Sequence, residues 1–166
     1  MNVMTSLRSV GFAAVMLGVL AIAGCAKQTP DQTAMAGAAV PGSQQDFIVN
    51  VGDRVFFESD SSDLTPQARD TLDKQAQWLN QYSRYAFTIE GHADERGTRE
   101  YNIALGARRA TAVRSFLAHQ GVAAARIRTI SYGKERPIAV CDEASCWNQN
   151  RRAQTILKNG AVARNY

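Results

Sequence analysis

The sequence predicts an α+β fold, in which one mixed β-sheet carries helices packed on one of its faces. Two long segments, 66–82 and 99–119, place apolar residues at helical spacing. Four shorter segments rich in aromatic and β-branched residues lie between and after them, which gives the order β-α-β-α-β-β. With 166 residues, the chain is long enough for one such domain with extensions.

The first strand and the first helix are predicted between residues 54 and 82. Arg54 to Glu58 has the composition of a strand, and a polar loop follows it. Thr65 is a favourable N-cap, and Pro66 suits the first helical position. The residues expected on the buried face of this helix are Ala68, Leu72, Ala76 and Leu79.

A second strand and a second helix follow. Tyr85 to Glu90 alternates, so that Phe87 and Ile89 share one face, and Gly91 ends the strand. The second helix covers about residues 99–119 and stops before Gly121.

The last two strands are predicted at 127–132 and 152–157. The connection between them contains Pro137 and the pair Cys141 and Cys146, and we expect it to be a loop. In an exported chain these two cysteines favour a local disulfide. A metal site is the alternative, but this spacing lacks a second ligand pair nearby, so no metal is expected.

The first 24 residues have the features of a lipoprotein signal peptide. The apolar run 10–23 is too short for a confident membrane span, and Arg8 precedes it. The junction Ile22-Ala23-Gly24-Cys25 resembles a bacterial lipobox, which implies cleavage before Cys25 and attachment of N-acyl and S-diacylglycerol groups to it. Ala26, in place of Asp, is typical of delivery to the outer membrane. An uncleaved signal anchor is the alternative.

Residues 25–46 are predicted to be a flexible tether, since they contain four Pro and Gly residues and no apolar periodicity. The folded domain is expected at 47–160, with a tail at 161–166. The whole chain carries a net charge of +4, with basic residues interspersed among acidic ones. A mixed solvated surface accounts for this distribution, which gives no support to nucleic-acid binding.

The strongest functional signal is the segment Gly91-His92-Ala93-Asp94-Glu95-Arg96-Gly97 together with the helix that follows it. On that helix, Arg109 lies within an apolar stripe, where a charge is costly unless it has a partner. We therefore expect Arg109 to be partly buried and paired with Asp94, and its neighbour Arg108 to be solvated. The expected stripe comprises Asn102, Leu105, Arg109, Val113 (or Ala112) and Phe116.

Two interpretations of Asp94 and Arg109 remain open at this point. They form an internal salt bridge that closes the strand–helix connection, or they hold a site for a zwitterion, whose ammonium binds the carboxylate and whose carboxylate binds the guanidinium. The acid/base-rich cluster of Glu90, His92, Asp94 and Glu95 also raises an amidase or glycosidase as an alternative. No activated nucleophile or metal motif accompanies this cluster, so an enzyme is not expected.

The chain carries three linked motifs: G-H-A-D-E-R-G-T-x-E-Y-N-x-x-L-G-x-R-R-A-x-x-V, then S-Y-G-K-E-x-P, then N-x-x-R-R-A. Over roughly residues 50–158, they resemble the OmpA-like peptidoglycan-binding domain family. The lipobox and tether make the chain similar to the lipid-anchored members of the Tol-Pal system. The element C-D-E-A-S-C-W resembles a variation of alphaproteobacterial members.

The resemblance implies roles for individual residues. Asp94 would bind the ammonium of meso-diaminopimelate and Arg109 its carboxylate, with Asp60 as a further acid. Ser59 departs from the bulkier residue usual in this family, and Arg151 and Arg152 would be structural or surface residues. Residues expected to line the same pocket are Ala93, Arg96, Thr98, Asn102 and Leu105.

The resemblance also implies a non-enzymatic, periplasm-facing outer-membrane lipoprotein that binds peptidoglycan and uses no cofactor beyond its own lipid. Its implied partners are TolB and, indirectly, the Tol inner-membrane complex, with a role in envelope integrity and in outer-membrane constriction at cell division. A protein-interaction role without wall binding, and an OmpA-like lipoprotein of another system, are the alternatives.

Overall fold

The structure is a computed structural model that describes residues 39–158. The predicted signal peptide, the lipidation site Cys25, most of the tether and the tail 161–166 lie outside these residues. The elements in chain order are α1 (Gln44–Asp46), a π-helical turn (Phe47–Val51), β1 (Arg54–Phe56), α2 (Pro66–Gln81), β2 (Ala86–His92), α3 (Arg99–His119), a 3₁₀ turn (Ala124–Arg126), β3 (Ile127–Gly133), α4 (Ala144–Asn150) and β4 (Arg152–Lys158).

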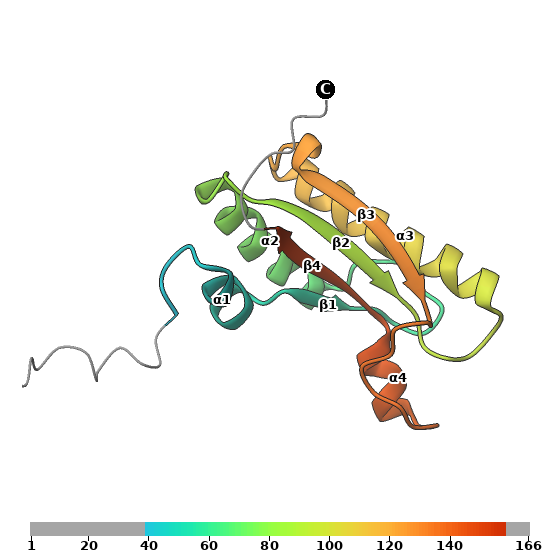
Figure 1. The fold of residues 1–166 in the computed structure, drawn as a ribbon. Coiled ribbons are helices and arrows are strands. Elements are labelled where there is room, and N and C mark those ends of the chain that lie inside the picture. The colour runs from blue at the N-terminus through green and yellow to red at the C-terminus, as the bar shows by residue number, and fades with distance from the viewer. Residues whose placement is uncertain (1–38, 159–166) are drawn as a thin grey trace, which may run out of the picture. The chain divides into compact units, whose positions relative to one another are not determined.

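The four strands form one sheet in the order β1-β4-β2-β3. Strands β2 and β3 are parallel, and β4 is antiparallel to both β1 and β2, so the sheet is mixed. Helices α2 and α3 cover one face of it, as Figure 1 shows. The predicted α+β class, strand order along the chain and placement of helices on one face are confirmed.

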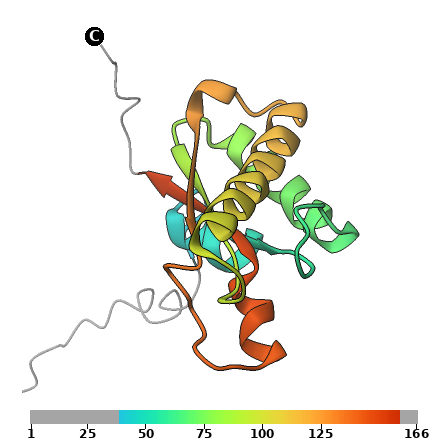
Figure 2. The ribbon, with the colours of Figure 1, turned by 90° about the vertical axis from the view of Figure 1, so that its right-hand side faces the viewer.

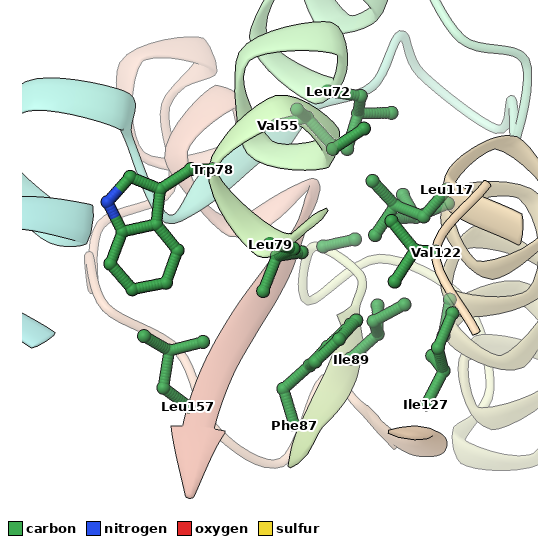
Figure 3. Packing of buried hydrophobic residues seen from close by; sticks show 14 of the residues in the cluster. Val55, Leu72, Trp78, Leu79, Phe87, Ile89, Leu117, Val122, Ile127 and Leu157 are labelled. Carbon is green, nitrogen blue, oxygen red and sulfur yellow. The ribbon is translucent and has the colours of Figure 1, made fainter. Parts of the chain in front are cut away.

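Helix α2 begins as the sequence predicts. The Thr65 side chain accepts a hydrogen bond from the Ala68 amide at 3.1 Å, and Pro66 is the first helical residue. The predicted apolar stripe is buried, and Leu72 and Leu79 are fully so. Figure 3 shows Leu72 beside Val55 of β1, and Leu79 near Phe87 and Ile89 of β2.

Helix α3 approaches β2 closely because two glycines meet. A Cβ atom at Gly91 would overlap the carbonyl of Gly106, and one at Gly106 would overlap Ser131 Oγ. The absence of side chains at both positions therefore sets how near α3 lies to the end of β2. The buried stripe of α3 ends in Leu117, which is fully buried, while Phe116 is only partly buried.

Two features differ from expectation. Residues ahead of Phe47 already pack on the domain, since Trp78 Nε1 donates to Asp46 Oδ2 at 2.8 Å and Tyr85 donates to the Gly42 carbonyl at 2.8 Å. Helix α4 occupies part of the connection expected to be a loop. The disulfide that the cysteine pair favours joins Cys141 to Cys146, and Cys146 lies within α4.

Figures 1 and 2 place α4 at the end of the sheet where β2 and β3 finish and β4 begins. The side chains at this end form the site described below. Among residues 39–158, no helix has the length and apolar character needed to cross a bilayer.

Candidate ligand-binding site

Arg109 of α3 is fully buried and donates hydrogen bonds to three backbone carbonyls. Its Nε reaches Ser61 O at 2.8 Å, its Nη1 reaches His92 O at 2.8 Å, and its Nη2 reaches Glu58 O at 3.1 Å. Burial, and then the nearby charge of Arg151, lower the pKa of Arg109 to about 10. The guanidinium thus ties the loop after β1 to the end of β2.

The expected pairing of Arg109 with Asp94 is wrong, because loop and strand carbonyls take the donors instead. An internal Asp94–Arg109 salt bridge is therefore not what closes the strand–helix connection. Arg109 is fully buried rather than partly buried as expected. Its neighbour Arg108 is exposed, as expected, with its guanidinium 5.9 Å from the Tyr101 ring centroid.

Asp94 lies just beyond the end of β2, 7% exposed, between two other arginines. Arg96 donates from Nη2 at 2.7 Å, from Nε at 3.1 Å and from its backbone amide at 3.2 Å. Arg151 Nη1 lies 3.4 Å from the same carboxylate. Burial raises the pKa of Asp94, but the hydrogen bonds from Arg96 outweigh it and hold the pKa below its usual value. Asp94 is therefore a fixed, ionised carboxylate at neutral pH.

A cavity of about 240 Å³ opens beside Asp94. Five residues predicted for the site line it: Asp60, Asp94, Arg96, Asn102 and Leu105. Ser59, the position that departs from the family pattern, lines it as well, and so do Gly97 and Tyr101. The structure thus brings two carboxylates and a partly exposed guanidinium to one small cavity, an arrangement suited to a ligand that carries both charges.

Three predicted residues do not line this cavity. Ala93 is buried, and its amide donates to the Gly133 carbonyl at 2.9 Å. Thr98 is the N-cap of α3 and accepts from the Tyr101 amide at 3.2 Å. Arg109 lies behind the loop that carries Asp60. All three support the cavity from outside.

Sequence reasoning missed Tyr101, whose hydroxyl donates to Asp60 Oδ1. Asp60 itself adopts the left-handed conformation, with φ of 56°, which Asp tolerates better than most residues. The signal available in the sequence was the position of Tyr101 in the first turn of α3, where it borders the loop 94–97. Ser59, which precedes Asp60 in the loop after β1, accepts a hydrogen bond at its Oγ from Arg96 Nη2 at 2.9 Å.

Helix α4 contacts the site through Trp147, which sequence reasoning also missed. Its Nε1 donates to Glu95 Oε1 at 3.0 Å, and the Arg96 guanidinium carbon lies 4.3 Å from the centroid of its indole ring. A cation over an aromatic face is attracted to it. Trp147 therefore orients the arginine that holds Asp94.

Arg151 connects α4 to the site by a second route. It is buried, donates to the Phe57 carbonyl at 3.0 Å and to Asn148 Oδ1, and contacts Asp94. Its predicted structural role is confirmed, whereas a surface position for Arg151 or for the buried Arg152 is wrong. The N-x-x-R-R motif identified both arginines, but it did not predict that their side chains are buried.

His92 is a packed residue rather than part of the cavity. It is 2% exposed, its ring lies 5.7 Å from that of Tyr132, and neither ring nitrogen has a hydrogen-bond partner within residues 39–158. Burial, followed by the charges of Arg152 and Arg136, lowers its pKa to about 4. A neutral, enclosed imidazole of this kind is poorly placed to exchange protons with a substrate beside Asp94.

Comparisons with known proteins show the family. The OmpA family profile matches residues 56–153. A peptidoglycan-associated lipoprotein of Mesorhizobium japonicum is 64% identical over 148 residues, covering 86% of this chain and 88% of that protein. One from Pseudomonas aeruginosa is 42% identical over 158 residues, covering 86% of this chain and 94% of that protein.

Solved structures show the same fold. The crystal structure of the peptidoglycan-associated lipoprotein from Burkholderia pseudomallei superposes with a TM-score of 0.62 and 40% identity, covering 64% of this chain and 90% of that one. The C-terminal domain of Helicobacter pylori MotB shares the fold at 23% identity, with a TM-score of 0.61, over 66% of this chain and 86% of that one. By its motifs, its fold and these relatives, the chain belongs to the OmpA family and, within it, to the peptidoglycan-associated lipoproteins.

Proposed function

We propose that this protein is an outer-membrane lipoprotein that binds peptidoglycan non-covalently through the meso-diaminopimelate residue of the stem peptide. The observation that carries the proposal is the small cavity in which Asp60 and Asp94 lie beside Arg96. Diaminopimelate presents an ammonium and a carboxylate on one carbon, and this cavity offers a partner for each.

In this proposal the carboxylates of Asp94 and Asp60 bind the ammonium group. The guanidinium of Arg96, whose side chain is 45% exposed, binds the carboxylate. Arg109 has the role of holding the loop that carries Asp60. A direct contact of Arg109 with the ligand, which the family resemblance implies, would require loop carbonyls to release its guanidinium first.

Selectivity and strength follow from the same groups. Lysine lacks the second carboxylate, so a site that offers a guanidinium to that group favours diaminopimelate over lysine. The charged groups are already held by Arg151, Trp147 and Ser59, which reduces the ordering cost of binding. Weak binding by one domain becomes firm attachment when many lipid-tethered copies face a polymeric wall.

The proposed setting is the periplasmic face of the outer membrane, with Cys25 as the lipid attachment site and no other cofactor. As a member of the Tol-Pal system, the protein would bind TolB on a surface that overlaps the wall cavity, and so alternate between the two partners during constriction at division. Family membership supports this setting. We propose binding without catalysis, because buried His92 and its neighbour Glu90 do not line the cavity.

The test is a pull-down of residues 26–166 with purified sacculi that contain diaminopimelate, beside sacculi that contain lysine. We expect binding to the first kind only, lost in Asp94→Asn, weakened in Arg96→Ala, and retained in the matched control Arg108→Ala. Circular dichroism verifies that each variant is folded. Equal binding by folded wild type and folded Asp94→Asn would refute the proposed site and leave a protein partner as the leading alternative.

A further inference from the structure

A second and larger cavity, of about 650 Å³, adjoins the site. Its lining comes from the end of β1, the start of α2 and from α4. Glu58 lines this cavity while the next residue, Ser59, lines the smaller one. Arg151 also lines the larger cavity, and it contacts Asp94 in the smaller one. The two cavities therefore share a wall.

The larger cavity combines an exposed aromatic ring with neutral polar groups. Phe56 is 45% exposed at its edge. The neutral donors and acceptors around that ring are the hydroxyl of Thr65 and the amides of Gln67, Asn148 and Gln149. A ligand with one apolar face and a polar, uncharged edge matches this lining.

The charged groups of this cavity do not favour an ionic ligand. The Arg151 guanidinium is already engaged by the Phe57 carbonyl at 3.0 Å, by Asn148 Oδ1 and by Asp94. Glu58, exposed at the rim, would repel an anion. A neutral ring with hydroxyl and acetamido groups is therefore favoured over a second carboxylate or a phosphate.

We propose that the larger cavity binds an N-acetylated amino sugar of the same peptidoglycan strand whose diaminopimelate enters the smaller cavity, an inference that rests on the proposed function. Diaminopimelate is the third residue from the sugar, and three extended residues span roughly 10 Å. Adjoining cavities with a shared wall suit such a distance. Phe56 lies under the apolar face of the sugar ring. Asn148 Nδ2 and Gln149 Oε1 bind its polar edge, because Asn148 Oδ1 already accepts from Arg151 and Gln149 Nε2 already donates to the Ser145 carbonyl at 3.2 Å.

Helix α4 makes this wall firm enough to recognise a sugar. The disulfide between Cys141 and Cys146 closes the loop that contains its start. At its other end, buried Asn150 accepts from the Ile138 amide at 2.9 Å and donates to the Ala139 carbonyl at 2.8 Å. The amides of Asn148 and Gln149 are thereby presented from a braced element.

The test compares two soluble ligands by calorimetry on residues 26–166: the stem tripeptide that ends in diaminopimelate, and the same tripeptide attached to its disaccharide. We expect wild type to bind the glycosylated ligand about tenfold more tightly, the size expected from one aromatic contact. Phe56→Ala and, separately, exposed Gln149→Ala should reduce this difference and leave the affinity for the free tripeptide unchanged. Ile130→Ala, an equally exposed apolar residue on β3, is the matched control.

The outcomes separate the two proposals. If wild type binds both ligands equally, or if Phe56→Ala and Gln149→Ala both weaken the two ligands alike, the sugar site is wrong while diaminopimelate binding stands. If wild type binds neither ligand, the proposed function fails and the sugar site fails with it.

Discussion

The two walls of the small cavity are built in different ways. One wall comes from regular elements, with Asp94 at the end of β2 and Asn102 and Leu105 on α3, and core packing fixes it. The opposite wall comes from the loop after β1, which carries Ser59 and Asp60. Side-chain hydrogen bonds to backbone carbonyls hold this second wall in place, chiefly those from Arg109.

This difference teaches that a buried arginine can serve as the framework of a site without being its ligand contact. Arg109 joins the loop wall to the strand wall, and Arg151 joins the loop to both Asp94 and α4. Because a guanidinium has five donors in a fixed plane, one side chain can bind several segments at once. The wall formed by the loop after β1 is thereby held almost as firmly as the wall formed by β2 and α3.

The largest effect should follow from removing this connection with Arg109→Ala. Three carbonyls would lose their donor in a buried place, which costs roughly 3–6 kcal/mol of unfolding free energy. Urea unfolding of this variant, beside the exposed Arg108→Ala, measures the loss. The control should stay within about 0.5 kcal/mol of wild type.

A different result would change the comparison. If Arg109→Ala is as stable as wild type but no longer binds sacculi, Arg109 contacts the ligand directly. The loop carbonyls would then be only its resting partners, and the two walls would move relative to each other when ligand binds.

The next largest effect should come from His92, the buried last residue of β2, the strand that precedes Asp94. The pKa of His92 is about 4 in the folded chain, against an ordinary value of 6.5. The unfolded chain therefore takes up a proton at higher pH than the folded one. The contribution of neutral His92 to the free energy of unfolding is fully present above about pH 6.5. It is lost as the pH falls toward 4, which lowers the free energy of unfolding by about 3 kcal/mol.

Urea unfolding at several pH values between 7.5 and 4 measures this dependence. His92→Gln should flatten the curve relative to wild type, since other groups titrate equally in both. His119→Gln, at an exposed position on α3, is the matched control for replacing a histidine with glutamine. Parallel curves for wild type and His92→Gln would contradict this prediction. They would show that protonation of His92 does not change the free energy of unfolding.

The contrast between the walls also explains what the sequence could predict. Helical spacing predicted the buried stripes of α2 and α3, and a charge within an apolar stripe predicted the burial of Arg109. Its partners could not be predicted, because the carbonyls of Glu58 and Ser61 carry no sequence signal and lie about fifty residues away along the chain.

The same limit applies to α4. It has only seven residues, too few for a periodic pattern, and its cysteines and nearby Pro137 are typical of a loop. The contact of Trp147 with Arg96 depends on how this short helix lies against the loop 94–97. Five of the eight residues predicted for the site line its cavity. The other three, Ala93, Thr98 and Arg109, make structural hydrogen bonds instead, to partners that the sequence pattern did not indicate.

The smallest effect should come from releasing α4, and it tests whether the irregular wall needs its brace. Replacing Cys141 and Cys146 with Ser removes the disulfide. Because the loop that it closes is short, the disulfide contributes about 2 kcal/mol at most to the free energy of unfolding. If α4 orients Arg96 through Trp147, the variant should bind the stem tripeptide a few-fold more weakly.

Trp147→Ala should weaken binding to a similar extent, whereas Trp147→Phe, which keeps an aromatic face for Arg96, should retain most of it. Calorimetry with the free tripeptide measures each change, and unfolding in urea separates it from stability. Unchanged binding in the serine variant would mean that Arg96 holds Asp94 without help from the disulfide, so that the disulfide serves only the larger cavity beside it.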